Sequence, residues 1–136
     1  MPVILDKIIN GNRIRIFDIK GKTYYEYYQG KSYISKTLLC DEFGKELEDI
    51  EYDSSGKILS HFRREYTENS FTETFRSKLE NYTRNFSIRF ISGYKHIFDR
   101  FNSFTHPEKN NIKDYVYNEN GNLIRILNNG KMFEIS

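Results

Sequence analysis

Apolar and polar residues alternate over short stretches of this chain, which is the pattern of β-strands that turn one face towards a core. In residues 85–90, for example, Phe86, Ile88 and Phe90 alternate with polar side chains. The segment from Thr23 to Tyr28 carries aromatic side chains on both faces instead. The pattern predicts strands at residues 3–9, 13–19, 23–28, 32–39, 47–52, 58–66, 71–77, 82–91, 95–101, 112–117, 123–127 and 131–135.

Glycines mark the turns between these segments. Seven of the eight glycines are followed by Lys or Asn and then, within two positions, by an apolar residue, so each predicts a turn that leads into a strand. The Asn-Gly pairs at 10–11, 120–121 and 129–130 favour the left-handed backbone of tight hairpins. In residues 41–44, 53–56 and 118–121, Asp or Asn begins a type I turn and Gly follows three positions later.

The region from residue 70 to 104 also permits a helix. Two sets of apolar residues fall at helical spacing: Phe71, Phe75, Leu79 and Tyr82, and Tyr94, Ile97, Phe98 and Phe101. Residues 70–73 fit a capping box, so a helix over 71–81 competes with a strand, and residues 94–102 present the same alternative. Thr72, Thr74 and the alternation around them favour the strand. Residues 106–111 are predicted to form a loop.

The spacing of the turns indicates the fold class. Turns recur every 9 to 14 residues, and strands this close together pair antiparallel, because parallel strands need long crossover connections. We therefore expect residues 1–136 to form a single mostly-β domain. The expected architecture is an antiparallel meander of about 10–12 short strands. We expect this meander to be closed into a barrel or folded in two layers, with at most one helix within residues 70–104.

Two segments resemble YD repeats, the tandem β-hairpin units of the Rhs and teneurin families. Residues 52–58, Tyr-Asp-Ser-Ser-Gly-Lys-Ile, fit the Tyr-Asp-x-x-Gly-x-Leu/Ile core, and residues 117–123 fit it with Asn118 in place of Asp. Residues 40–47 form a looser third copy with one extra residue. The resemblance implies a β-hairpin array in a bacterial toxin-system setting, where small repeat proteins of this kind sometimes serve as immunity proteins or antitoxins. It carries over no functional residue, because the motif residues are structural.

The composition is biased in a way that nucleotide bias explains in part. Ile, Phe, Tyr, Lys and Asn supply 63 of the 136 residues, and Ala and Trp are absent, as a strongly AT-rich genome would produce. No apolar run is long enough to cross a membrane, and the first residues lack the basic start and apolar core of a signal peptide. The single cysteine, Cys40, rules out an internal disulfide and fits a reducing compartment. We therefore expect a cytoplasmic protein with no membrane association.

Charge is nearly balanced but unevenly placed. The net charge is +2 overall, +4 over residues 1–40, −6 over residues 41–75 and +4 over residues 76–101. The acidic and basic segments can pair across a sheet or mark separate contact surfaces. Arginines alternate with aromatic residues in residues 84–90, as in some nucleic-acid-binding sheets, but so small a net charge disfavours nucleic acid as the partner.

The sequence shows no catalytic or cofactor-binding motif. His61, His96 and His106 lie outside any metal-binding spacing, and Cys40 has no neighbouring His to form a nucleophile pair. Phosphate-binding glycine loops and the G-x-S-x-G element are absent from the sequence. We therefore expect a protein without catalytic residues, metal or cofactor.

Two clusters are the candidate partner-binding residues. Tyrosine offers a large, rigid contact area with a polar tip, and the tyrosine cluster consists of Tyr24, Tyr25, Tyr27, Tyr28 and Tyr33. The acidic cluster consists of Glu46, Glu48, Asp49 and Glu51. Alternation along a strand predicts that Glu46 and Glu48 share one face, and that Asp49, Glu51 and Asp53 share the other. Cross-strand packing of the tyrosines and a solvated edge strand explain the same clusters without a partner.

These features support three classes of function. The leading hypothesis is a non-catalytic protein-binding module, of the bacterial immunity or antitoxin type, that occludes a toxin. The alternative is a carrier of a small ligand or lipid in an up-and-down β-barrel, which suits the length and the strand count. The missing Trp argues against the lipocalin and avidin signatures. An enzyme ranks third, since no catalytic constellation is present in the sequence.

Overall fold

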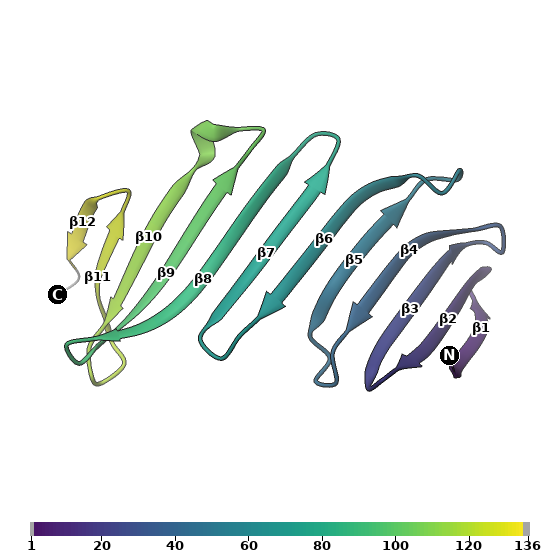
Figure 1. Ribbon diagram of the computed structural model, residues 1–136, viewed down its shortest axis with the longest axis horizontal. Coiled ribbons are helices and arrows are strands. Elements are labelled where there is room, and N and C mark those ends of the chain that lie inside the picture. The colour runs from purple at the N-terminus through teal and green to yellow at the C-terminus, as the bar shows by residue number, and fades with distance from the viewer. Residues whose placement is uncertain (1, 135–136) are drawn as a thin grey trace. The chain divides into compact units, whose positions relative to one another are not determined.

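The computed structural model describes residues 2–134, which form twelve strands and one short 3-10 helix, η1 (Pro107–Lys109). The strands lie in one sheet in the order of the chain, so sequential neighbours pair antiparallel (Figure 1). Their bounds are β1 (Val3–Ile9), β2 (Asn12–Ile19), β3 (Lys22–Gln29), β4 (Tyr33–Cys40), β5 (Glu46–Tyr52), β6 (Ile58–Tyr66), β7 (Ser70–Ser77), β8 (Asn81–Ile91), β9 (Tyr94–Ser103), β10 (Asn111–Tyr117), β11 (Leu123–Asn128) and β12 (Lys131–Glu134).

The antiparallel meander predicted from the alternation is confirmed, and the observed strand limits differ from the predicted ones by no more than two residues. Only the last predicted position, residue 135, lies outside the described residues. The strand favoured over a helix at residues 71–77 is confirmed as part of β7, and the strand expected at 95–101 is confirmed as part of β9. The alternative helices at these places are not formed. In the predicted loop at 106–111, three residues form η1. Among residues 2–134, β1 pairs with β2 alone and β12 with β11 alone, so the sheet is not closed into a barrel.

The chain divides into two compact units. Unit 1 consists of the residues up to Arg64 together with Phe75–Lys78, and unit 2 consists of Glu65–Thr74 together with the residues from Leu79 onwards. Strands β1–β5 therefore belong to unit 1, and strands β8–β12 belong to unit 2.

Seven of the connections between the described strands are turns of two kinds. In the first, both central residues take a positive φ, as in Asn10-Gly11 (51° and 81°) and Asn129-Gly130 (51° and 83°). This is the geometry predicted for these Asn-Gly pairs, because it matches the twist of the flanking strands. Lys20-Gly21 and Ser92-Gly93 adopt it as well. The expectation for Asn120 is wrong, since only Gly121 of that pair has a positive φ.

The second kind of turn occurs three times with the same hydrogen bonds, and it begins at Asp41, Asp53 and Asn118. In each copy the Oδ1 atom of the first residue accepts the backbone N–H groups two and four positions later, at 2.9–3.0 Å. The N–H of the glycine donates to the carbonyl of the first residue at 3.0–3.1 Å. The side chain thus supplies an acceptor for N–H groups that the tight turn leaves without a strand partner.

A β-bulge follows each of these three turns and shifts the register. The residue before the turn pairs with the residue six positions ahead, as Cys40 does with Glu46 and Tyr52 with Ile58. The residue that follows this partner, Leu47 or Leu59, is the extra residue of the bulge. Residues 40–47 therefore form a turn of the same length as the other two, with Glu46 in the position of Ile58. Because a bulge adds one residue to one strand, it changes which side chains share a face beyond it.

Among the described residues, neither unit has a core confined to one face of its strands. The first eight residues of β8 are all half-buried, whereas a strand with one covered face alternates between buried and exposed positions. Within residues 2–134, the buried apolar side chains are those of Phe17 and Cys40 in unit 1 and Val116 in unit 2. Apolar and aromatic side chains are therefore partly accessible on both faces, and each face is a candidate contact surface.

Candidate binding surfaces

The predicted tyrosine and acidic clusters lie on the adjacent strands β3, β4 and β5 of unit 1. Residues paired across antiparallel strands share a face, so the register divides the clusters between two faces. We call the one that carries Tyr25, Tyr27 and Tyr33 the Tyr25 face, and the one that carries Tyr24 and Tyr28 the Tyr24 face. All five tyrosines are half-buried, so each keeps some accessible surface.

The Tyr25 face carries a row of paired side chains that crosses six strands. The row consists of Leu5, Ile16, Tyr25, Leu38, Asp49 and Phe62, each directly opposite the next. The rings of Tyr25 and Tyr27 stack at 6.1 Å with an interplanar angle of 9°. Every member of the row is half-buried. The face thus presents an aliphatic and aromatic surface in which the carboxylate of Asp49 lies between Leu38 and Phe62.

The Tyr24 face is held together by polar and charged contacts between its own side chains. Arg13 donates to Asp6 through Nε and Nη2 at 2.9 and 2.7 Å, and its guanidinium lies 5.3 Å from the centroid of the Tyr28 ring. Arg15 lies 4.8 Å above the ring of Phe17. Burial, followed by the charge of Glu26, raises the pKa of Tyr24, which keeps this hydroxyl protonated. On the Tyr24 face, Arg13 and Asp6 thus bind each other, and Arg13 and Arg15 lie over aromatic rings, which makes the Tyr25 face the better candidate for a partner.

The carboxylates of the acidic cluster also divide between the faces, and the bulge corrects one expectation. Asp49 and Glu51 share the Tyr25 face, as alternation predicts. Glu46 does not share a face with Glu48, because the inserted Leu47 places Glu46 opposite Cys40, on the Tyr25 face. The remaining member of the expected set, Asp53, lies in a turn.

Three of these carboxylates bind basic side chains within the sheet. Asp49 contacts Lys36 at 3.3 Å, and Glu46 accepts a hydrogen bond from Arg64 at 2.8 Å. On the Tyr24 face, Glu48 lies 3.0 Å from His61. The expected pairing of acidic and basic segments across the sheet is therefore present at Lys36 and Asp49.

The other reactive residues occupy structural positions. His96 lies 3.0 Å from Asp114, and His106 lies 3.5 Å from Glu108. Cys40 is buried, and this burial, followed by the charges of Glu46 and Asp41, raises the pKa of its thiol. Such a thiol is a poor nucleophile at neutral pH. Within residues 2–134, no three His, Cys, Asp or Glu side chains come close enough together to hold a metal ion.

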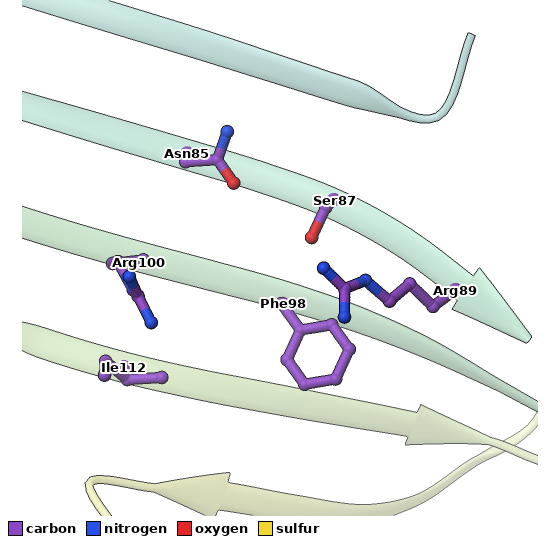
Figure 2. Close-up of a pocket in the computed structure, with 6 residues that line it drawn as sticks. All are labelled: Asn85, Ser87, Arg89, Phe98, Arg100 and Ile112. Atoms are coloured by element: carbon purple, nitrogen blue, oxygen red, sulfur yellow. The ribbon is translucent and has the colours of Figure 1, made fainter. Parts of the chain in front are cut away.

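A hollow on unit 2 brings part of segment 84–90 together with residues of β9 and β10 that the sequence motifs did not single out. It has a volume of about 410 Å³ and is lined by Asn85, Ser87, Arg89, Phe98, Arg100 and Ile112 (Figure 2). The arginines of segment 84–90 do not act together, because Arg84 and Arg89 are five residues apart on β8 and lie on opposite faces. Arg84 binds Asp99, whereas Arg89 lines the hollow.

No helix in the described part of the chain is long and apolar enough to cross a membrane. Comparison of the chain with protein-family models, with curated proteins and with solved structures finds no match.

Proposed function

We propose that this protein is a non-catalytic protein-binding module and that its partner docks on the Tyr25 face. The supporting observation is the half-buried row from Leu5 to Phe62, with the stacked rings of Tyr25 and Tyr27 at its centre. Rigid aromatic side chains with apolar neighbours are the usual energetic centres of protein interfaces. The polar tips of the tyrosines let this surface tolerate water when no partner is bound.

The carboxylates that β5 places on the Tyr25 face, those of Asp49 and Glu51, indicate the chemistry of the partner. Glu51 is exposed and lies opposite Lys36, whose ammonium group contacts Asp49. A partner that places basic side chains against Asp49 and Glu51 and apolar side chains against the tyrosines complements this face in both respects. The proposed partner is therefore a protein with a basic rim around an apolar patch.

We further propose that the partner is a bacterial toxin and that the module acts in the cytoplasm as an immunity or antitoxin-type protein. The resemblance of residues 52–58 and 117–123 to YD repeats supports this setting. A toxin gene next to the gene for this chain would support the proposal. A crosslinked partner that proves harmless when expressed alone in the source organism would overturn the toxin assignment.

The ligand carrier considered as an alternative required a closed barrel. Because β1 and β12 each have one partner strand in the described residues, the sheet has no enclosed lumen of that kind. We do not propose this function.

Site-specific photocrosslinking in the source cells tests the docking face. Benzoylphenylalanine replaces Tyr27 in one variant and Tyr28 in the other, so that adjacent positions on β3 report on opposite faces. We expect a protein adduct from position 27 and a much weaker one from position 28. Equal adducts from both positions, or none from position 27 in a variant that keeps its far-ultraviolet circular dichroism spectrum, would refute the proposed docking face.

A further inference from the structure

The hollow on unit 2 lies on one face of β8, β9 and β10, where the register brings its lining residues together. Asn85 pairs with Arg100, Ser87 with Phe98, and Arg100 in turn with Ile112. Arg89 is two residues beyond Ser87 and extends over the hollow towards Phe98 (Figure 2). The cross-strand pair Ser87–Phe98 therefore lies between the pair Asn85–Arg100 and the position of Arg89. Asn85 and Arg89 are four residues apart on β8, which corresponds to about 13 Å along the strand.

The two arginines of the hollow differ from most others in unit 2. Arg84 is bound by Asp99 at 2.9 Å, and Arg125 lies 3.8 Å from Glu134. Within the described residues, no carboxylate comes within 4 Å of the guanidinium group of Arg89 or Arg100, and both side chains are exposed. Two guanidinium groups beside one hollow, neither of them in contact with a carboxylate of the described residues, create a site that favours an anion.

The neighbouring groups narrow the chemistry of that anion. The hydroxyl of Ser87 and the amide of Asn85 line the same hollow, although the amide also donates to Thr72 at 2.8 Å. Phe98 and Ile112 supply an apolar floor, and Ile112 is 47% exposed. The one carboxylate on this face beside Phe98, that of Asp114, contacts His96. The hollow thus combines cationic and hydroxyl donors with a small apolar surface.

The ring of Phe98 is poorly placed for a nucleobase. The guanidinium of Arg89 lies 5.6 Å from its centroid, and the ring of His96 stacks against it at 5.7 Å and 14°. Nucleic-acid-binding sheets instead leave an aromatic face open for each base. The geometry therefore favours recognition of the phosphate group rather than of a base.

We propose that this hollow binds a small organic phosphate monoester. The phosphate lies beside the cross-strand pair Ser87–Phe98. There Arg89 and Arg100 approach it from two sides, and the Ser87 hydroxyl donates to it. The organic part of the ligand lies on Ile112, which is 47% exposed. The site is separate from the Tyr25 face and does not depend on the function proposed for that face, because all of its residues belong to unit 2.

Titration with phenyl phosphate and with inorganic phosphate, followed by the arginine Nε–H signals in NMR spectra of the labelled full chain, tests the proposal. We expect saturable binding that shifts the signals of Arg89 and Arg100, with phenyl phosphate bound about threefold or more tightly than inorganic phosphate. Arg89→Gln and Arg100→Gln should each weaken binding about tenfold or more, because each removes a charge-assisted hydrogen bond.

The matched control is Lys113→Gln, which makes the same change in charge on β10 but on the opposite face, where Lys113 pairs with Asp99. It should leave the affinity for phenyl phosphate unchanged. Equal loss in this control and in the arginine variants, or no saturable binding, would overturn the site. Equal affinity for the two phosphates would overturn the organic ligand. Tighter binding of an oligothymidylate, with a steep dependence on salt, would overturn it in favour of single-stranded nucleic acid.

Discussion

The ion pair between Arg84 and Asp99 is the best place to measure how charged contacts stabilise this sheet. Arg84 donates from Nε and Nη2 to the two carboxylate oxygens at 3.1 and 2.9 Å, and its guanidinium lies 4.7 Å above the ring of Phe86. The side chain of Asp99 is only 11% exposed, whereas that of Arg84 is 43% exposed. This hydrogen bond is the main cause of the raised pKa of Arg84, so the arginine is charged at every pH of interest.

Arg84→Met removes the charge and all the donors but keeps a side chain of similar reach. A hydrogen bond to a charged group contributes about 1.5–3 kcal/mol, and water around the exposed guanidinium reduces this value. The contact with Phe86 adds about 0.5–1 kcal/mol. Because the substitution also leaves a nearly buried carboxylate without its bidentate partner, we expect a loss of about 2–3 kcal/mol in the free energy of unfolding.

Urea unfolding followed by far-ultraviolet circular dichroism measures this loss. The matched control is Arg100→Met, the same substitution on the neighbouring strand at an exposed arginine with no ion pair among the described residues, and it should cost less than about 0.5 kcal/mol. Asp99→Asn completes a double-mutant cycle, in which we expect a coupling energy above about 1 kcal/mol. Additive effects of Arg84→Met and Asp99→Asn in the double mutant, or equal losses for Arg84→Met and Arg100→Met, would refute the reasoning.

Three further predictions concern the turns. Asn118→Ala should lower the free energy of unfolding by about 1 kcal/mol because two backbone N–H groups lose their acceptor, whereas Asn118→Asp, which keeps the acceptor, should leave it nearly unchanged in urea unfolding. Ser92→Asn should raise the thermal midpoint, because Ser92 has a φ of 52° that Asn tolerates better; no rise would contradict this explanation. The Ser55 hydroxyl, followed by the Lys57 N–H, lowers the pKa of Asp53, so any stability that this carboxylate contributes is present above its unfolded pKa and is lost as the pH falls through the lowered pKa. Ser55→Ala should raise the pKa of Asp53 in an NMR titration, and an unchanged midpoint would count against this explanation.

Turn chemistry explains why the strand limits were predictable. Each Asn-Gly or Asp-x-x-Gly element leaves the chain few alternatives to a hairpin, so a strand must begin and end within a residue or two of it. Residues 71–81 were ambiguous for a physical reason. Phe71 and Phe75 are four positions apart, and that spacing puts two side chains on one face in a helix and in a strand alike. In the structure Phe71 contacts Phe86, and Phe75 contacts Phe62.

The apolar residues of segment 94–102 have helical spacing because β9 carries aromatic and aliphatic residues on both of its faces. Tyr94 and Phe98 share one face, and Ile97 and Phe101 share the other. Together they give a spacing of three and four residues, which a strand with one apolar face does not show. The ambiguity therefore follows from the absence of a single core face.

The sequence motifs identified the tyrosine cluster but not the face that its members share, because that depends on pairing and on bulges. Counting outwards from the Ser92-Gly93 turn would have placed Arg100 beside Asn85 and so revealed the hollow, since this hairpin has no bulge. The same counting fails at Glu46, because the inserted Leu47 reverses the face of the residue before it. Register is thus predictable from sequence only where a turn fixes it and no bulge interrupts it.

The distribution of burial makes the two proposed surfaces separable from the stability of the fold. A half-buried or exposed side chain on a sheet face contributes its cross-strand contacts, about 0.2–1 kcal/mol each, whereas the removal of a buried side chain costs about 2–5 kcal/mol. Tyr27 and Arg89 belong to the first class, and Phe17 and Val116 belong to the second. Because β3 is in unit 1 and the hollow is in unit 2, substitutions at Tyr27 and Arg89 can change binding at one surface while the fold and the other surface persist. A loss of partner crosslinking without a loss of phosphate binding, or the reverse, can therefore be assigned to a surface rather than to unfolding.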